Sequence, residues 1–336
     1  MKILITGESG VIPQQISKLA PLFNCSIINT QLEETPVDFL KNYQAFNVRK
    51  HELDFTNATI LEAVAKINKP DLVIHSGAFV GTDYCDSKKD EAVMTNVFGT
   101  KLIVDFCNQL NIPIVYFSTT AIFDPKSYGR FSPINENTKI NPRTLYGITK
   151  YAGELIVKNE CVTPYMIVRP VFGFGDYPDD LHSAITKLMY MLYTDKQYDS
   201  KLKILLNPTI GKNYFRVENI AYIVLRLIQE EAWGEEINVG ENFNERKNWY
   251  KMFDLINQAS DKVSNVLLRD KNQLAADISE KITFEPESDY LHWHNIDNSR
   301  MRDIIGDEFV LTTFEKGLEK TITSIITNQD KKPYWI

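Results

Sequence analysis

Short apolar runs alternate with segments of helical periodicity through the first half of this chain, and this alternation limits its fold more than any other feature. The apolar runs have the length of strands and cover residues 2–6, 25–29, 45–48, 71–76, 112–118 and 165–170. Between them, segments such as 58–69 and 91–111 place apolar residues three and four positions apart, as amphipathic helices do. Strands that are apolar on both faces belong to parallel sheets covered by helices on both sides. The sequence therefore predicts a doubly wound α/β domain.

The pattern changes after Pro170, which predicts a second unit. A loop comes first, and then a helix with a stripe of large side chains that we expect to form core rather than a cofactor site: Met189, Tyr190, Met191 and Tyr193. A strand follows, and a further helix begins at residues 217–220. We predict a dinucleotide-binding domain over residues 1–170, to which about 214–240 return. Residues 171–213 and 241–336 are predicted to form a smaller α/β substrate-binding domain.

Composition excludes several classes of protein. The net charge of the 336 residues is −7 and no basic cluster marks a nucleic-acid footprint. The apolar runs fall far short of the roughly 20 residues of a membrane span, and the N-terminus shows no signal-peptide pattern. The four cysteines form no CxxC pair and the five histidines show no metal spacing. We therefore expect a cytoplasmic protein with reduced thiols and no metal site.

Two glycines follow the first apolar run. Gly7 and Gly10 match the first two glycines of a G-x-x-G-x-x-G turn between a strand and a helix. Such a turn holds a pyrophosphate on backbone N–H groups at the helix N-terminus. Pro13 stands where the third glycine is usual, but it falls in the first helical turn, where its missing N–H is tolerated. We expect the pyrophosphate to lie over residues 7–12.

A tyrosine and a lysine four residues apart carry the predicted chemistry. Tyr146 and Lys150 face the same way on a helix. An ammonium beside a phenol lowers the phenol pKa, so Tyr146 is expected to exchange a proton with a substrate oxygen while a nicotinamide exchanges hydride with the same carbon. Thr119, at the end of an apolar run, is expected to orient that oxygen, with Ser118 as the alternative if the register slips by one.

These residues lie in a longer series of motifs that resembles the extended short-chain dehydrogenase/reductases, the family of nucleotide-sugar epimerases, dehydratases and reductases. The series runs from Lys2 to about Leu318 and includes "LDFTN", "VIHSGAFVG", "TNVFGT", "YFSTTAIFD", "YGITKYAGE" and "VRPVFGFGD". It looks most like the dTDP-4-dehydrorhamnose reductase branch. The resemblance implies a Rossmann fold, an NAD(P) cofactor and a nucleotide-sugar substrate.

The resemblance also implies the residues of the cofactor site. Asp54 would bind the adenine amino group, and residues 75–81 would line the nicotinamide ribose. The run 25–29 ends in Asn29 without the carboxylate typical of NAD enzymes, which slightly favours NADP over NAD. The full cofactor set is Gly7, Ser9, Gly10, Val11, Ile12, Asn29, Asp54, Phe55, Ser76, Gly77, Ala78, Asn96, Ser118, Tyr146, Lys150, Pro170 and Val171.

Substrate contacts are expected from Thr120, His182, Lys212 and Arg216, the last two through the diphosphate. Two departures from the family narrow the reaction. The dehydratases carry Asp and Glu after the catalytic threonine, where this chain has Thr120 and Ala121. The GDP-fucose synthase branch has a cysteine for epimerisation where Ala121 stands. Neither water elimination nor that epimerisation is therefore expected.

The reading that these residues favour is NAD(P)-dependent reduction of a 4-keto nucleotide sugar. A nucleotide-sugar 4-epimerase, which uses the same Tyr146, Lys150 and Thr119, is the alternative. A non-catalytic NAD(P)-binding regulatory subunit is the alternative of another class. The resemblance further implies a homodimer that pairs through two helices, here residues 91–110 and 146–158.

Overall fold

The computed structural model describes residues 1–8, 10–28, 55–56, 68–124, 132–176, 183–193, 202–204, 211–212, 214–241, 247–263, 282–284 and 296–328. Within them, a six-stranded sheet has the order β10-β5-β4-β3-β1-β2, and each neighbouring pair is parallel. Its strands are β1 (Lys2–Thr6), β2 (Ser26–Ile28), β3 (Leu72–His75), β4 (Ile114–Phe117), β5 (Tyr165–Pro170) and β10 (Glu236–Val239). The predicted doubly wound fold is confirmed. Strand order reverses between β1 and β3, and ligands of such sheets bind outside the carboxyl ends of the strands at this point.

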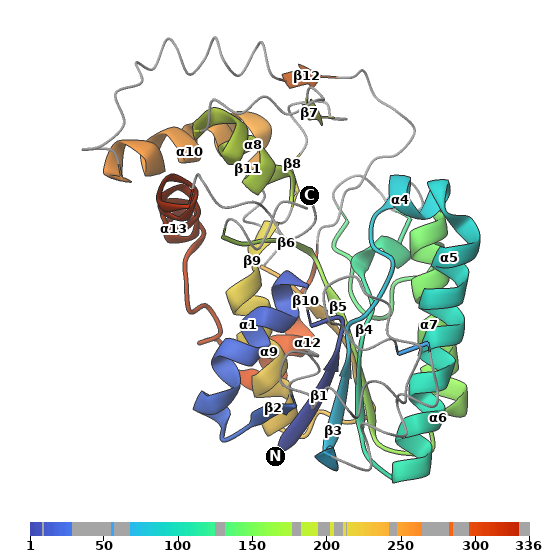
Figure 1. The fold of residues 1–336 in the computed structure, drawn as a ribbon. Coiled ribbons are helices and arrows are strands. Elements are labelled where there is room, and N and C mark those ends of the chain that lie inside the picture. Colours follow the sequence, from blue (N-terminus) through green and yellow to red (C-terminus); the bar gives the residue numbers. More distant parts are fainter. Residues whose placement is uncertain are drawn as a thin grey trace, which may run out of the picture.

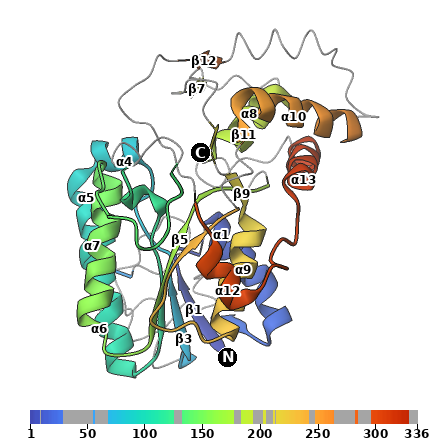
Figure 2. The ribbon, with the colours of Figure 1, turned by 180° about the vertical axis from the view of Figure 1, so that it is seen from behind.

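Helices cover both faces of the sheet, as the apolar strands predict (Figures 1 and 2). One layer holds α1 (Val11–Leu19), α9 (Val217–Gln229) and α12 (Ser299–Ile305), and the other holds α6 (Thr100–Leu110) and α7 (Leu145–Glu160). Within β1, Ile3 and Ile5 pack in the core that contains Ile16 of α1, whereas Leu4 packs in the core that contains Val157 of α7. Successive side chains of a strand point to opposite faces. Both faces of the sheet are buried, so the side chains on either face of β1 are apolar.

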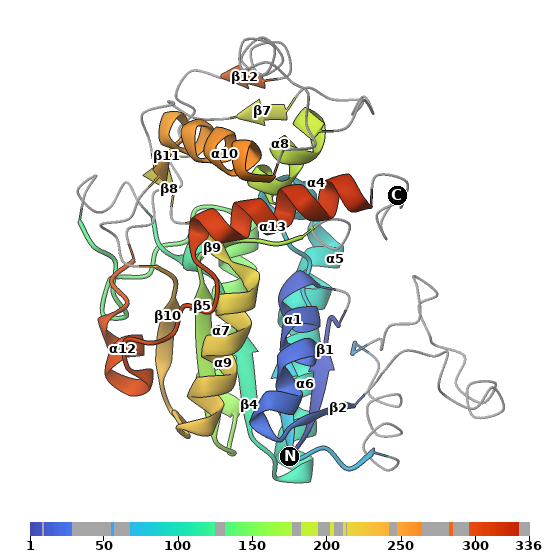
Figure 3. The same ribbon diagram turned by 90° about the vertical axis from the view of Figure 1, so that its left-hand side faces the viewer.

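A second cluster of helices lies beyond the carboxyl ends of the strands (Figure 3). It consists of α8 (Ala184–Tyr193), α10 (Trp249–Val263) and α13 (Phe314–Thr327). Short strand pairs accompany it: β6 (Phe172–Phe174) with β9 (Tyr214–Arg216), β7 (Leu202–Ile204) with β12 (Ile282–Phe284), and β8 (Gly211–Lys212) with β11 (Lys247–Asn248). We call this cluster the cap unit, and the sheet with its two helix layers the sheet unit.

The stripe of large side chains on α8 lies inside the cap unit. Met189, Tyr190 and Tyr193 are buried and pack against residues of α10 and α13. The expectation that they form core is confirmed for these three. The side chain of Met191 lies outside the described part of the structure.

The helix expected over residues 91–111 is interrupted. It consists of α5 (Lys89–Val93), a π-helical segment η3 (Met94–Gly99) and α6. A π-helical turn changes the direction of the following side chains. Here it accompanies Asn96, whose side chain is fully buried and bonds the backbone of Phe79. Periodicity alone does not reveal such a turn or the contact of Asn96 with the distant loop.

Part of the C-terminal region lies with the sheet unit. Ile296, Met301, Ile305 and Phe309 belong to the same core as β1, β5 and α9. The sequence assigned the whole of 241–336 to the second domain. The physical reason for the difference is that α12 supplies an apolar face that covers the sheet beside α9 and β10. Residues 45–48 and all but Asn68 and Lys69 of the segment 58–69 lie outside the described residues.

Candidate active site

The loop after β1 has the geometry of an anion-binding turn. Gly7 has φ +70° and its carbonyl accepts the N–H of Gly10 at 3.0 Å, and α1 then begins at Val11. The first helical hydrogen bond runs from Gln14 N–H to Gly10 at 3.1 Å, so Pro13 lies within the first turn. This matches the expectation that the proline leaves the helix start intact. The half-buried Val11 and Ile12 follow the turn directly, and Ser9 lies outside the described residues.

The loop after β3 lies directly against this turn. A Cβ on Gly7 would lie 2.6 Å from the Cα of Gly77, so the two loops touch through their backbones. A Cβ on Gly77 would meet the ring of Phe55 at 2.3 Å. Ser76, Gly77 and Ala78 therefore lie at the carboxyl edge of the sheet beside Gly7, as the sequence predicts for one cofactor site. Phe55 is buried behind them and supports the loop.

Asn96 holds the same loop from the helix side. Its Oδ1 accepts the N–H of Phe79 at 2.7 Å, and its Nδ2 donates to the carbonyl of Phe79 and to Thr149 Oγ1, each at 3.0 Å. The side chain is fully buried and its donors are used. Asn96 therefore supports the loop of residues 76–79.

Tyr146 and Thr119 meet at the carboxyl edge of the sheet. Tyr146 lies in the first turn of α7, which Thr144 caps by accepting the N–H of Gly147 at 3.1 Å. Thr119 follows β4, and its hydroxyl also accepts the N–H of Ala121 at 3.2 Å. Burial raises the pKa of Tyr146 to about 12, and a side-chain hydrogen bond with Thr119 acts in the opposite direction. The tyrosine is therefore a protonated phenol at neutral pH.

Lys150 lies one turn further along α7 and is almost completely buried, with 2% of its surface exposed. Its Nζ is 4.2 Å from the centre of the Tyr116 ring, a cation–π contact. Burial lowers the pKa of Lys150 to about 7, against the raising effect of Glu154. The sequence predicted that Lys150 would lower the pKa of Tyr146. In the structure the pKa of Tyr146 is raised instead, because burial disfavours the charged phenolate.

A buried ion pair fixes α7 to the sheet below this site. Arg169 of β5 donates to Glu154 through Nε at 2.8 Å and Nη2 at 2.7 Å, and both side chains are fully buried. Glu236 of β10 also bonds Arg169. Pro170 and Val171 follow at the end of β5, where Val171 N–H bonds the carbonyl of Val239 at 2.9 Å. The expected position of both residues beside the site follows from this pairing.

Two further hydroxyls of the predicted site point inward. Ser118 is buried, and its hydroxyl has no partner among the described residues. Thr120 is also buried and donates to the carbonyl of Pro170 at 3.5 Å. Thr120 was expected to contact substrate, and here its hydroxyl faces the protein backbone.

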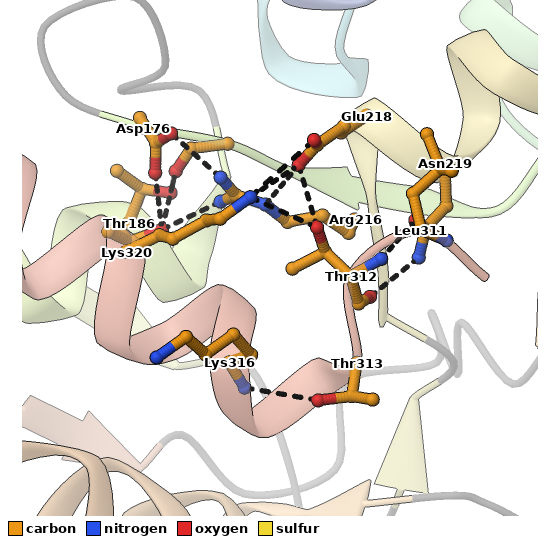
Figure 4. A network of polar contacts seen from close by, with 12 residues as sticks. Asp176, Thr186, Arg216, Glu218, Asn219, Leu311, Thr312, Thr313, Lys316 and Lys320 are labelled. Atoms are coloured by element: carbon orange, nitrogen blue, oxygen red, sulfur yellow. Dashed lines mark hydrogen bonds and ion pairs between the residues drawn. The ribbon is translucent and has the colours of Figure 1, made fainter.

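Arg216 lies inside a polar network that joins the cap unit to the sheet unit (Figure 4). Its Nη2 donates to Asp176 Oδ2 at 2.7 Å and its Nη1 to Thr321 Oγ1 at 2.9 Å, while the guanidinium lies 5.5 Å from the ring centre of Phe174. Only 3% of Arg216 is exposed. A substrate diphosphate would therefore have to displace Asp176 to reach it.

The remaining predicted residues divide into two groups. Lys212 lies opposite Lys247 in the strand pair of β8 and β11, which accompanies the cap unit. Three residues of the cofactor set and one of the substrate set lie outside the described residues: Ser9, Asn29, Asp54 and His182.

Sequence reasoning missed Tyr116, Thr6 and Thr100. A polar residue inside or at the end of an apolar run was the available signal for Thr6 and Tyr116.

The described residues hold neither a metal-binding cluster nor a membrane-spanning helix. No group of three or more histidine, cysteine, aspartate or glutamate side chains in those ranges is placed to hold a metal ion. Of the helices that the structure describes, none combines the length and hydropathy needed to cross a membrane.

Comparison with known proteins gives a family match and distant relatives. A family model described as RmlD substrate binding domain matches residues 1–267. The dTDP-4-dehydrorhamnose reductase of Streptomyces griseus is 25% identical over 172 residues, which are 51% of this chain and 50% of that protein. Methionine adenosyltransferase 2 subunit beta of Xenopus tropicalis is 25% identical over 201 residues, 60% of this chain and 54% of that protein. The chain thus spans about half the length of these curated relatives.

Solved structures share the fold over nearly the whole chain. UDP-glucose 4-epimerase of Thermotoga maritima, solved with UDP-glucose, has a TM-score of 0.75 at 16% identity, covering 98% of this chain and 100% of that one. RMD of Pseudomonas aeruginosa, solved with NADPH, has a TM-score of 0.73 at 16% identity, covering 97% of this chain and 99% of that one. At this identity the likeness establishes a Rossmann fold with a cap.

Proposed function

Because the chain belongs to the RmlD substrate binding domain family, we propose that it is an NAD(P)-dependent enzyme that reduces the 4-keto group of a nucleotide-linked sugar. The observation that carries this proposal is the contact between Tyr146 and Thr119 at the carboxyl edge of the sheet. The glycine loop lies against the loop of residues 76–78 at the same edge. A dinucleotide on the first loop and a sugar on Tyr146 would therefore meet at one place.

The residues fit the cofactor that the family uses. Gly7 and Gly10 leave the backbone open at the start of α1, and a Cβ on Gly7 would collide with Gly77. Donors at a helix N-terminus favour a pyrophosphate. The absence of a carboxylate at Asn29–Thr30–Gln31 removes the repulsion that a 2′-phosphate would meet, so we propose NADP as the preferred form.

Each residue of the site has a defined part in reduction. A bound nicotinamide supplies the hydride to the carbonyl carbon. Thr119 hydrogen-bonds the carbonyl oxygen and orients it, and Tyr146 donates its phenolic proton to that oxygen as the negative charge develops. The ketone thereby gains one hydride and one proton and becomes an alcohol. Lys150 holds the nicotinamide ribose and, when charged, stabilises the phenolate that remains.

Tyr146 has the protonation state from which a reduction starts. With a pKa of about 12, the phenol keeps its proton at neutral pH and is ready to donate it. An epimerase must first remove a proton from a sugar hydroxyl, which needs the phenolate. The epimerase remains a second candidate because the fold of the Thermotoga maritima epimerase matches nearly the whole chain.

The experiment that tests the proposal is an NADPH oxidation assay with a dTDP-linked 4-keto-6-deoxy sugar. We expect the absorbance of NADPH to fall in step with formation of a 4-hydroxyl product identified by NMR, and we expect Tyr146→Phe to stop both. Interconversion of 4-hydroxy sugars without net NADPH consumption would assign the epimerase. Dinucleotide binding without turnover of either kind would assign a non-catalytic regulatory subunit, and the Xenopus tropicalis relative is named as a subunit.

We also propose a homodimer that pairs through η3 with α6 and through α7. Large apolar side chains are exposed on these helices: Met94 at 54%, Phe98 at 54%, Ile148 at 49% and Leu155 at 41%. Burying such a patch is a common reason for association. Light scattering after gel filtration should give a dimer for wild type and a monomer for Phe98→Asp. The control Val162→Asp, at an 82% exposed position beyond α7, should remain a dimer. A monomeric wild type would contradict the pairing.

Two coarser assignments complete the proposal. Cys25, Cys85, Cys107 and Cys161 are free thiols, which suits the cytoplasm, where thiols stay reduced. We propose that the cofactor is held by residues 1–170 with 214–240, and the substrate by 171–213 with 241–336. Residues 296–309 are the exception, since they pack on the sheet unit.

A further inference from the structure

A line of hydrogen bonds runs through the interior of the sheet unit, with His75 at its centre. His75 ends β3 and is fully buried. Its Nδ1 lies 2.7 Å from Thr6 Oγ1 at the end of β1, and its Nε2 lies 3.1 Å from Thr100 Oγ1 at the start of α6. The imidazole therefore joins the strand that leads into the glycine loop to the helix that follows Asn96.

One arrangement of hydrogens satisfies the bonds of Thr100 to Asn96 and of Thr6 to Gly77. Thr100 donates its hydroxyl hydrogen to the carbonyl of Asn96 at 2.7 Å, so its oxygen accepts from the imidazole. His75 Nε2 must then carry the hydrogen, and Nδ1 is left as an acceptor. Thr6 Oγ1 accepts the N–H of Gly77 at 3.1 Å and donates its own hydrogen to Nδ1. A neutral imidazole in the Nε2–H tautomer completes the line.

The two ends of this line reach the two halves of the candidate active site. On one side, Gly77 is the residue whose backbone lies against Gly7. On the other side, Asn96 donates to Thr149 Oγ1 at 3.0 Å, and Thr149 donates to the backbone carbonyl of Tyr146 at 3.0 Å. The line thus links the loop beside the pyrophosphate turn to the first turn of the helix that carries the proton donor, and at Asn96 it passes from the backbone carbonyl to the side chain.

We propose that His75 is a positioning residue that couples the glycine loop to the helix of Tyr146. In this assignment the imidazole touches neither cofactor nor substrate. It fixes the distance between the two loops and the Tyr146 hydroxyl, so that a dinucleotide on the glycine loop presents its reactive carbon at the proton donor. The kinetic part of the test rests on the proposed function, and the spectroscopic part does not.

The surroundings of His75 maintain the neutral form. Phe55 packs edge-on against the imidazole at 5.1 Å and Tyr116 lies 5.7 Å away, both measured between ring centres. The Nζ of Lys150 lies 4.2 Å from the centre of the Tyr116 ring. Burial, and after it the charge of Lys150, lowers the pKa of His75 well below its usual value. In the neutral form Nδ1 is free to accept the hydroxyl hydrogen of Thr6.

The first experiment reads the tautomer directly. Long-range ¹⁵N–¹H correlation spectra of the full chain with labelled histidine, compared with those of His75→Gln, identify the two nitrogens of His75. We expect a neutral Nε2–H imidazole that does not change between about pH 5 and 8, the range in which an ordinary histidine titrates. An Nδ1–H tautomer, or an imidazole that titrates in this range, would overturn the proposal whatever the enzyme does.

The second experiment cuts the line at two places. Thr100→Val keeps the shape of the side chain and removes its hydrogen bonds. His75→Phe keeps a flat ring, which is somewhat larger, and removes both bonds of the imidazole. We expect each variant to lower kcat for the 4-keto sugar about tenfold. The double variant should lower it about tenfold as well, because the two residues act through the same line of hydrogen bonds and their effects do not add. His75→Gln places an amide donor near the position of Nε2 and should recover part of the loss. Thr163→Val removes another buried hydroxyl, one that contacts Cys161, and should leave kcat unchanged.

The outcomes separate this proposal from the proposed function. Losses that multiply to about a hundredfold in the double variant would mean independent structural damage and would overturn the coupling. If wild type reduces no 4-keto sugar, the reductase assignment fails, and the coupling is decided by hydrogen exchange at the Gly77 amide. Thr100→Val should then raise that exchange rate about tenfold and Thr163→Val should not, since opening of the line exposes the amide. An unchanged rate would overturn it.

Discussion

The ion pair of Glu154 and Arg169 gives the sharpest stability prediction, through the substitution Glu154→Gln. Both side chains are fully buried, so water cannot replace the carboxylate that is lost. Two charge-assisted hydrogen bonds, at 2.8 and 2.7 Å, join the pair, and each such bond contributes about 1.5–3 kcal/mol. Removing one partner of a buried pair typically costs 3–5 kcal/mol. Glutamine keeps one acceptor and Glu236 still bonds Arg169, so we expect a loss of about 3 kcal/mol.

Urea unfolding followed by circular dichroism measures this loss as a lower midpoint at an unchanged slope. Glu160→Gln is the matched control. Glu160 lies on the same helix and pairs with Lys101 at 3.1 Å, but the two side chains are 44% and 38% exposed. Exposed pairs contribute about 0–1 kcal/mol. If Glu154→Gln destabilised the protein no more than Glu160→Gln does, the buried pair would not be holding α7 to the sheet, and the reasoning from burial would be refuted.

Three further predictions concern the candidate active site. Tyr146→Phe should lower kcat by about 10²–10⁴-fold without lowering the melting temperature, because it removes only the proton donor, and unchanged turnover would exclude Tyr146 as the acid. Pro13→Gly should change NADPH affinity, measured by calorimetry, by less than about tenfold, because Pro13 already fits the first turn of α1, and a larger change would show that the proline shapes the pyrophosphate site. Lys150 has a pKa of about 7 in the folded protein against an ordinary value of 10.5, so the unfolded chain binds more protons between these two pH values and stability should rise with pH across that window. The free energy of unfolding of wild type should therefore increase relative to that of Lys150→Met from about pH 7 to 10, and a constant difference would contradict a depressed pKa.

The sequence predicted the fold, and the positions of Tyr146 and Thr119 in it, through features that are local. Residues 2–6 and 165–170 become strands because their side chains are apolar on both faces, and this is visible in the letters themselves. Tyr146 and Thr119 follow from the same logic. One begins a helix and the other ends a strand of a parallel sheet, so both lie at the carboxyl edge.

The features that the sequence did not predict depend on contacts between distant residues. Arg216 bonds Asp176 and Thr321, which are 40 and 105 positions away, so its burial cannot be inferred from its neighbours. The π-helical turn accompanies a bond from Asn96 to Phe79, 17 positions earlier, and such a contact is not visible in the local pattern. The pKa of Tyr146 is raised and that of Lys150 is lowered because both side chains are buried. Burial depends on packing, which the spacing of the two residues does not show.

The position of β10 has a consequence for how the chain is made. This edge strand is formed by residues 236–239, after the chain has left the sheet for the cap unit and come back, and α12 is added only at residues 299–305. A nascent chain that has reached Pro170 would expose the unpaired edge of β5, where other chains could add. The sheet unit therefore cannot finish folding on the ribosome as an early N-terminal domain. A graft of the cap unit onto another sheet would have to carry β10 and α12 with it.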